Sequence, residues 1–435
     1  MQTDKATNGA WYALGILFGI NLMNFYDRQI MGALAELIRK EWALNDALLG
    51  TLGTAFILMY AVVGLPLGRL ADTWSRRKIL AGGVSIWSIL TAVSGLAPSF
   101  GWMFVSRLGV GVGEASCAPA ANSLIGDLFP PRRRALALSI FMLGLPLGTF
   151  LCYRLSGLIA SAYTWRHAFY FACIPGLILG LLALKLPEPV RGATEEKPLQ
   201  ASLNQRSPFW QVLAIPTILW IIVSGALHNF NMYAVNSFLP AFLMRTHLLS
   251  LKEATNVSSI VLGAVGILGL LGGGWIADRW SRRRKDAKLL LSALCCGLAA
   301  PCIYLALNQP PGATLMFMLL MGTGIMLMFV YYSGVYASIQ EVIPPNLRGT
   351  AMALYFFAMY LLGASFGPVI TGLLSDHYAR RAMQAAGAVE LSEQFKAIGL
   401  HHAMYIIPTL GVALSVVLFA ASRTVKRDIE KMQMN

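Results

Sequence analysis

Apolar residues run along this chain in long segments that are separated by short polar stretches. A helix needs about 20 apolar residues to cross the hydrocarbon core of a membrane. Twelve segments meet this length, and the seventh is long enough to tilt or to extend beyond the bilayer: 10–33, 47–71, 79–97, 101–126, 135–160, 166–185, 210–243, 253–277, 288–307, 313–340, 349–375 and 398–421. The pattern therefore predicts an all-α membrane protein with twelve transmembrane helices.

Composition and charge agree with a protein that sits in a lipid bilayer. Of the 435 residues, 57% are hydrophobic and 12% are charged, whereas soluble domains carry about 25% charged residues. The net charge is +14, but the basic residues lie in clusters between apolar segments and form no nucleic-acid-binding stripe. Their bias toward one set of loops predicts that both termini are cytoplasmic. The compact loops favour a bacterial inner membrane.

Two features recur in the same order in both halves of the chain. The segment 68–78 (GRLADTWSRRK) is repeated at 274–284 (GWIADRWSRRR). A second pair follows, at 127–132 and 341–348. The only long polar connection near the middle, 186–208, then divides an N-terminal six-helix bundle (1–185) from a C-terminal one (209–435). We expect a duplicated unit of two pseudo-symmetric bundles that functions as a monomer.

The charged residues of these repeated loops are candidates for a conformational latch. An acidic residue at a helix end can accept hydrogen bonds from a neighbouring helix N-terminus or can pair with a nearby arginine. Such ties would hold one state of a transporter and break in the other; the alternative is that these charges only set the orientation in the membrane. The candidate latch residues are Asp72, Arg76, Arg77, Asp127, Arg132, Asp278 and Arg282.

The repeated loop resembles the signature loop of the major facilitator superfamily, and the resemblance covers essentially the whole chain. The helix 4 motif from Arg107 to Ala115 and the glycine-proline segments 144–148 and 363–368 also look like superfamily motifs. The segment 24–28 (NFYDR), combined with Gly-Glu-Ala at 113–115, is similar to the spinster family. This resemblance implies a major facilitator fold and the transport of lysolipids, including sphingosine-1-phosphate. Organic anion–proton symporters share an Asp-Arg pair in helix 1 and are the alternative.

Two acidic residues fall deep inside predicted spans, where a charge is costly unless it is paired or hydrated. At 1.5 Å per residue, Asp27 and Arg107 share a depth, and Glu114 lies roughly 10 Å further along helix 4. The resemblance places helices 1 and 4 on a central cavity, which predicts a cluster of Asp27, Arg28, Arg107 and Glu114. We interpret Asp27 and Glu114 as proton-coupling residues and the two arginines as their partners; a static pair is the alternative.

Arg154 lies in the outer half of predicted helix 5, where the family pattern leads one to expect an apolar or small residue. Three interpretations stay open. The side chain binds a phosphate or carboxylate headgroup, it extends to the outer interface, or it is an engineered conformational lock.

Polar side chains in the second half are candidates for substrate contact. Predicted helix 7 carries His228, Asn229 and Tyr233, and predicted helix 10 carries Tyr331. These helices are the counterparts of helices 1 and 4, so the same cavity is expected to receive them. His228 titrates near neutrality and is either a proton carrier or a hydrogen-bonded structural residue.

The sequence contains no motif that indicates an enzyme. It lacks the nucleophile elbow, the zinc-binding His-Glu-x-x-His pattern and the phosphate-binding loop, and we expect no cofactor and no metal. Duplicated halves with charges at mid-depth favour alternating access over a channel. The predicted function is proton-coupled transport of a lipid-like small molecule, with an energy-independent lipid facilitator as the alternative to coupling.

Overall fold

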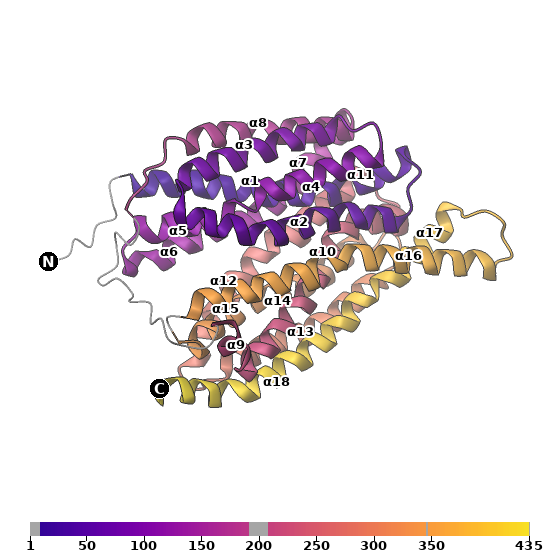
Figure 1. Ribbon diagram of the computed structural model, residues 1–435. Helices are drawn as coiled ribbons and strands as arrows, with labels where there is room; N and C mark the ends of the chain where they lie inside the picture. Colours follow the sequence, from indigo (N-terminus) through magenta and orange to yellow (C-terminus); the bar gives the residue numbers. More distant parts are fainter. Residues whose placement is uncertain (1–8, 191–207, 345–346, 435) are drawn as a thin grey trace. The chain divides into compact units, whose positions relative to one another are not determined.

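The structure is a computed structural model that describes residues 9–190, 208–344 and 347–434, and every regular element in these ranges is a helix (Figure 1). The first half contains α1 (Ala10–Glu41), α2 (Asp46–Thr73), α3 (Arg76–Gly95), α4 (Phe100–Glu114), α5 (Cys117–Leu128), α6 (Pro131–Met142), α7 (Gly144–Ala162) and α8 (Trp165–Ala183). The second half contains α9 (Pro208–Leu213), α10 (Pro216–Thr246), α11 (Leu251–Ser259), η1 (Ile260–Ala264), α12 (Val265–Ser281), α13 (Ala287–Leu307), α14 (Thr314–Val342), α15 (Arg348–Ala358), η3 (Met359–Ala364), α16 (Phe366–Ala385), α17 (Glu393–Met404) and α18 (Ile406–Met434).

These helices form two compact units whose division does not follow the sequence strictly. The first unit contains the described residues up to Leu44 and from Ala55 to 190, and the second contains 45–54 and 208–434. The first turns of α2 therefore pack with the second unit, where the Thr54 hydroxyl donates to the carbonyl oxygen of Ser365 at 2.5 Å. The predicted linker 186–208 stays a prediction, since most of it lies outside the described residues.

Ten helical segments of the described chain are long and apolar enough to cross a membrane. The twelve predicted spans include two segments that do not qualify by composition or length: α1 and the pair α4–α5. The reason is physical. α1 carries buried polar and charged side chains along its length, and the helix that contains Arg107 and Glu114 is interrupted at Ala115–Ser116. Of the two segments that carry the candidate charges, the one with Arg107 and Glu114 is thus divided into helices of 15 and 12 residues, each too short to span a membrane alone.

Several predicted spans are interrupted where proline or glycine changes the helix. The predicted span 210–243 is two helices, α9 and α10, because Pro216 begins a new helix at a position where its missing N–H costs nothing. The predicted span 349–375 contains the π-helical turn η3, whose last two residues are the first two of the predicted glycine-proline segment at 363–368. The corresponding glycine-proline segment of the first half, 144–148, begins α7 after a turn at Leu143.

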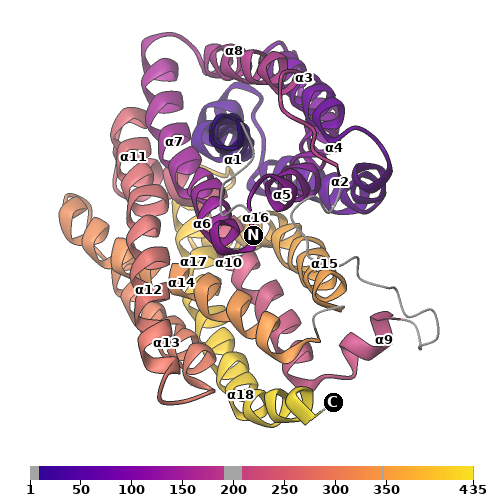
Figure 2. The same ribbon diagram turned by 90° about the vertical axis from the view of Figure 1, so that its left-hand side faces the viewer.

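In the first unit, α1 is the central helix. It packs against α5, α6, α7 and α8 (Figure 2). Two side chains fix its position: the Asn21 amide donates to the carbonyl oxygen of Phe141 at 2.7 Å, and the Tyr26 hydroxyl lies 3.1 Å from that of Ser156. Both bonding residues precede Asp27 and Arg28 in α1, and both of these charged side chains are buried.

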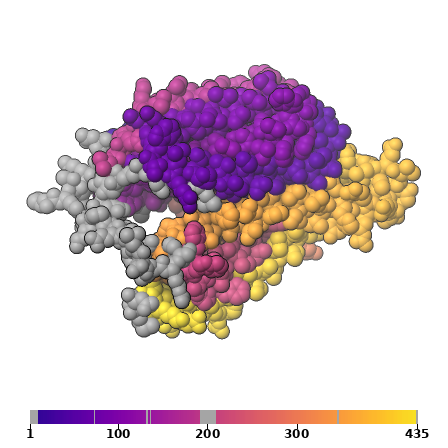
Figure 3. All heavy atoms as spheres, in the orientation of Figure 1, coloured from indigo at the N-terminus to yellow at the C-terminus, as the bar shows by residue number. Residues whose placement is uncertain are grey.

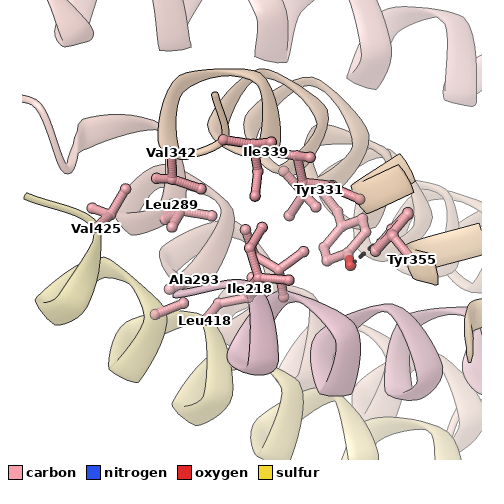
Figure 4. Packing of buried hydrophobic residues seen from close by; sticks show 14 of the residues in the cluster. Ile218, Leu289, Ala293, Tyr331, Ile339, Val342, Tyr355, Leu418 and Val425 are labelled. Atoms are coloured by element: carbon pink, nitrogen blue, oxygen red, sulfur yellow. Dashed lines mark hydrogen bonds between the residues drawn. The ribbon is translucent and has the colours of Figure 1, made fainter. Parts of the chain in front are cut away.

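In the second unit, α10 packs against α16, α17, α18 and η3. The described apolar core includes Ile218, Leu289, Tyr331, Tyr355 and Leu418, which come from five different helices (Figure 4). The far end of α16 and the helix α17 form a hairpin that extends past the neighbouring helices of this unit, drawn in yellow in Figure 3. Partly buried aromatic residues pack against this core: Tyr332, Tyr336, Phe356 and Tyr360.

Two glycines let helices approach closely at corresponding places in the two units. A Cβ at Gly148 would collide with the carbonyl oxygen of Leu22 in α1, and one at Gly367 would collide with that of Phe230 in α10. We expect Gly148→Ala to lower the free energy of unfolding by about 1–3 kcal/mol, because backbone cannot yield as a side chain can. Thermal unfolding in a mild detergent measures this effect. Gly15→Ala is the control, since a Cβ there meets nothing within 4 Å; equal destabilisation by both changes would contradict the explanation.

Candidate functional site

A buried ion pair connects the two helices that carry the predicted charges. Arg28 Nε of α1 lies 3.0 Å from Glu114 Oε2 of α4, and both side chains are almost fully buried. The Asn24 amide donates to the same oxygen at 3.0 Å. The second oxygen, Glu114 Oε1, has no hydrogen-bond partner among the described residues. Removing one partner of such a pair is costly, because it leaves the other charge buried.

Asp27 and Arg107 lie together in the same region but are not paired through their side chains. Arg107 Nη2 donates to the backbone carbonyl oxygen of Asp27 at 3.2 Å. Neither carboxylate oxygen of Asp27 has a partner among the described residues, nor do Nε and Nη1 of Arg107. Asp27 is 0% exposed and Arg107 is 1% exposed. Buried polar atoms that lack a partner are costly in the low dielectric of the interior.

Aromatic rings of α2 complete the surroundings of the two arginines. The Arg28 guanidinium carbon lies 4.1 Å from the ring centre of Tyr60, and that of Arg107 lies 5.0 Å from the ring centre of Phe56. Such cation–π contacts offset part of the cost of burying a guanidinium. Sequence reasoning missed these two rings, for which no polar signal existed. It also missed the role of Asn24, which its position one helical turn before Arg28 could have suggested.

A second buried ion pair lies near the C-terminal end of α1 and was also missed. Arg39 donates to both carboxylate oxygens of Glu36, at 3.1 and 2.7 Å, and each residue is 2% exposed. The prediction ended the first span at residue 33, which placed both residues in a loop. The structure corrects this, because α1 continues to Glu41.

Arg154 does not join the buried cluster of the first unit. It lies on α7 and is exposed, whereas its neighbours Cys152 and Tyr153 are fully buried. This position agrees with a side chain that extends toward an interface or toward a ligand. The three interpretations of Arg154 stay open.

Two of the four predicted polar residues of the second unit, His228 and Tyr331, meet at the contact between α10 and α14. The ring of His228 stacks on that of Tyr331, with centres 4.0 Å apart and planes at 8°. His228 is 0% exposed, and neither ring nitrogen has a partner among the described residues. The Tyr331 hydroxyl instead lies 2.9 Å from that of Ser224 and 3.1 Å from that of Tyr355 (Figure 4). The hydrogen-bonded structural role expected for a buried histidine is therefore not seen in this arrangement.

The other two candidates of the second unit point in different directions. The Asn229 amide donates to the carbonyl oxygen of Gly225 in its own helix at 3.1 Å. The Tyr233 ring makes an edge-on contact with Tyr360 of η3, with ring centres 6.5 Å apart. Tyr233 is thus placed with other aromatic residues, and Asn229 is engaged with backbone.

Two of the candidate latch residues, Arg76 and Asp127, form an ion pair in the first unit. The buried guanidinium of Arg76 forms an ion pair with Asp127 and donates to the Pro189 carbonyl oxygen at 2.6 Å. The backbone N–H of Arg76 donates to Glu188 Oε1 at 2.5 Å, and Arg77 Nε lies 3.5 Å from Glu188 Oε2. Glu188 therefore places a negative charge at the N-terminus of α3, which favours it. The side chains of Asp72 and Arg132 lie outside the described part.

The corresponding loop of the second unit has different partners. Asp278 and Arg282 are exposed, and neither forms an ion pair with another described residue. Glu341, the counterpart of Asp127, instead pairs with Lys288 at 2.5 Å. The latch role of Asp278 and Arg282 stays a prediction.

Comparison with known proteins places this geometry in a family. Residues 17–368 match the model of the Major Facilitator Superfamily. The chain belongs to that superfamily. It is 30% identical to an MFS-type efflux pump of Mycolicibacterium smegmatis, over 84% of this chain and 85% of that protein. It is also 30% identical to Protein spinster homolog 3 of Mus musculus, over 84% of this chain and 75% of the relative.

Further relatives and a solved structure give the same assignment. The Sphingosine-1-phosphate transporter SPNS2 of Xenopus tropicalis is 27% identical, over 99% of this chain and 86% of its own. A bacterial homolog of the human lysosomal transporter spinster, solved in an inward-facing and unoccupied conformation, superposes with a TM-score of 0.86 at 26% identity. That match covers 98% of this chain and 99% of the other. The resemblance seen in the sequence is confirmed: this is a multi-pass membrane transporter of the spinster type.

The spinster-type chain holds one more buried charge network, which the sequence did not reveal. The carboxylate of Asp46, the first residue of α2, receives two bonds of 2.8 Å from the guanidinium of Arg245 in α10. The Ser375 hydroxyl donates to it at 2.6 Å. The carboxylate of Asp376 accepts the backbone N–H groups of Asp46 and Ala47, each at 3.0 Å. All these residues belong to the second unit, so the network fastens the start of α2 to α10 and α16.

Proposed function

We propose that this protein is a proton-coupled secondary transporter that moves an amphipathic, lysolipid-like molecule by alternating access. The observation that carries the proposal is the buried group of Asp27, Arg28, Arg107 and Glu114. In the described part of the chain, Arg28 forms an ion pair with Glu114, while Asp27, Arg107 and Glu114 each retain atoms without a hydrogen-bond partner. The sphingosine-1-phosphate transporter among the relatives supports a lysophospholipid or sphingosine-phosphate substrate.

The coupling step follows from the positions of these side chains. A buried carboxylate that accepts no hydrogen bond is costly as an anion. We therefore infer that Asp27 is protonated in the conformation that the structure describes. Loss of that proton would leave a negative charge beside Arg107, whose Nε and Nη1 have no partner among the described residues. The new attraction would pull Arg107 toward Asp27 and alter the contact between α1 and α4. A change of charge thereby favours one conformation over the other.

The remaining predictions complete the proposal. We propose that both termini lie in the cytoplasm of a cell with an inner membrane. The transporter acts as a monomer with bundles at 1–185 and 209–435. Arg154, His228, Asn229, Tyr233 and Tyr331 are candidate substrate contacts. Asp72, Arg76, Asp127 and their counterparts in the second half are the cytoplasmic latch, for which the ion pair between Arg76 and Asp127 gives support.

Proton movement in proteoliposomes tests the proposal. With a pH-sensitive dye inside, addition of a lysophospholipid or of sphingosine-1-phosphate is expected to cause proton flux that protein-free vesicles lack. Flux with a small organic anion such as gluconate, and none with either lipid, would favour the organic anion–proton symporter instead. Lipid movement without proton movement would indicate an energy-independent facilitator and would contradict coupling.

A further inference from the structure

Exposed basic side chains gather at the end of the second unit where α13 begins and α18 ends. The loop 282–286 contains four basic residues and one acid, and the segment 423–431 of α18 contains four basic residues and two acids. We call the group that these two segments form the basic patch; it consists of six exposed residues: Arg282, Arg283, Lys285, Arg423, Lys426 and Arg427. The patch belongs to the second unit, whereas the candidate proton-coupling residues belong to the first.

The two segments of the basic patch are neighbours because α13 and α18 pack against each other. Apolar residues of both helices share the core drawn in Figure 4. Beyond this core, Lys285 Nζ of the loop lies 3.9 Å from Glu430 Oε1 of α18. The bonded guanidinium of Arg284 lowers the pKa of the Asp286 carboxyl group, and the charge of Lys426 on α18 adds to this effect. A single ligand can therefore contact the loop and the helix together.

The acids of the two segments neutralise only part of the basic patch. The pair of Lys285 and Glu430 is exposed on both sides, and such pairs contribute little. Asp428 is buried and accepts the backbone N–H and the hydroxyl of Thr217 at 3.0 and 2.6 Å, while Arg427 Nε lies 3.8 Å from its other oxygen. Three arginines of the patch form no ion pair with any described residue: Arg282, Arg283 and Arg423. Their charges remain available to a ligand.

One exposed face of α18 changes from apolar to basic just before the patch. Residues 412, 416, 419 and 423 are three or four positions apart, so they share this face. Val412, Val416 and Phe419 are exposed, and the guanidinium carbon of Arg423 lies 5.5 Å from the ring centre of Phe419. In a membrane protein, exposed apolar side chains face lipid tails, and long basic side chains extend to the headgroups. The change marks the level at which tails give way to headgroups.

The helix that leads into the loop shows the same change. In α12, Leu268, Leu271 and Trp275 are exposed, and Arg282 follows Trp275 by seven positions, which places it on the same face. Tryptophan is enriched at the interface between membrane and water. Two helices of the second unit thus pass from apolar to basic as they reach the basic patch.

A phosphate group attached to lipid tails fits both properties of this surface. Guanidinium groups donate paired N–H bonds to phosphate oxygens, and clusters of four to eight Lys and Arg residues beside a transmembrane helix attract anionic lipids. A zwitterionic lipid has no net charge and gains less from the patch. A soluble phosphate makes no use of the exposed apolar face of α18.

We infer that the basic patch binds the headgroup of an anionic phospholipid whose tails lie along the exposed apolar face of α18. The lipid is a bound component of the membrane and not the transported molecule. The inference therefore needs neither the proposed substrate nor proton coupling. It requires only that the second unit spans a membrane.

Native mass spectrometry in an uncharged maltoside detergent tests the inference, with added phosphatidylglycerol or phosphatidylcholine that have the same tails. The triple variant Arg283→Gln, Arg423→Gln, Lys426→Gln removes three positive charges and breaks no ion pair with a described residue. We expect it to bind phosphatidylglycerol about 10- to 100-fold more weakly and phosphatidylcholine as before. In the unmodified protein, an increase from about 0.05 to about 0.5 M NaCl should weaken phosphatidylglycerol binding. Binding that does not respond to salt would overturn the inference without any variant.

A matched triple variant separates this site from general attraction to a positive protein. Lys78→Gln, Arg133→Gln, Lys185→Gln also removes three exposed basic side chains, which belong to the first unit and which the sequence places on the same side of the membrane. This variant should bind phosphatidylglycerol as the unmodified protein does, and thermal midpoints should show that both variants are folded. Equal losses in the two triple variants would overturn the site. Competition by glycerol 3-phosphate at the same concentrations as phosphatidylglycerol would overturn the lipid as its occupant.

Discussion

Asp27→Asn is expected to abolish substrate-driven proton movement while leaving the protein folded. The amide has nearly the shape of the carboxyl group but cannot exchange a proton at neutral pH. Because neither carboxylate oxygen of Asp27 has a partner among the described residues, the change breaks no ion pair. A coupling free energy of about 1–3 kcal/mol corresponds to about a 5- to 150-fold loss of uphill transport. Proton flux and lipid accumulation in proteoliposomes measure this loss.

Glu114→Gln is expected to differ from Asp27→Asn, because the Glu114 carboxylate has bonding partners. Glu114 accepts from both Arg28 and Asn24 at 3.0 Å, so loss of its charge weakens the ion pair that it forms with the buried Arg28. We expect this variant to lose coupling and also about 1.5–3 kcal/mol of stability, the size of a hydrogen bond to a charged group. Asp27→Asn should instead unfold close to the midpoint of the unmodified protein.

A matched control uses an acid of the same helix that lies outside the cluster. Glu41 ends α1 and pairs with Arg166 at 2.7 Å, with 40% of its side chain exposed. Glu41→Gln should retain full proton flux, since exposed pairs contribute little. If Asp27→Asn also retained full flux, Asp27 would not be the proton carrier. Equal stability loss in Asp27→Asn and Glu114→Gln would mean that Asp27 has a partner of comparable strength.

How far the sequence predicts this site depends on what helix geometry alone can decide. A rise of 1.5 Å per residue placed Asp27 and Arg107 at one depth, and the structure brings Arg107 within 3.2 Å of the Asp27 backbone. Which arginine pairs with which acid was not predictable. That choice depends on side-chain rotamers and on the rings of Tyr60 and Phe56, which approach from a third helix.

The helix count shows a second limit. Hydropathy separates apolar spans from loops, but it falls where a helix carries the charges that function requires. α1 continues to Glu41, beyond the predicted end at residue 33, because Glu36 and Arg39 neutralise each other inside the protein. A buried ion pair three residues apart is invisible to a sum of residue hydropathies, although the spacing itself allows the contact.

Asp46→Ala is expected to be the most destabilising single change in the second unit. The Asp46 carboxylate receives two bonds of 2.8 Å from Arg245, and each side chain is 4% exposed. Removal of the carboxylate leaves the guanidinium of Arg245 buried without its anion, which costs about 3–5 kcal/mol. Denaturant unfolding in a mild detergent measures the loss. The sequence could not suggest this pair, because the two residues are 199 positions apart and share no motif.

The double variant decides whether the pair also matters for transport. Asp46→Ala combined with Arg245→Met removes both charges, so most of the stability lost in the single variant should return. The first turns of α2 belong to the second unit, and the helix continues in the first unit from Ala55. In the double variant, no ion pair connects the first residue of α2 to α10. We therefore expect near-normal stability with altered transport. Simply additive stability losses would contradict the pairing, and unchanged transport in the stable double variant would show that the network only supports the fold.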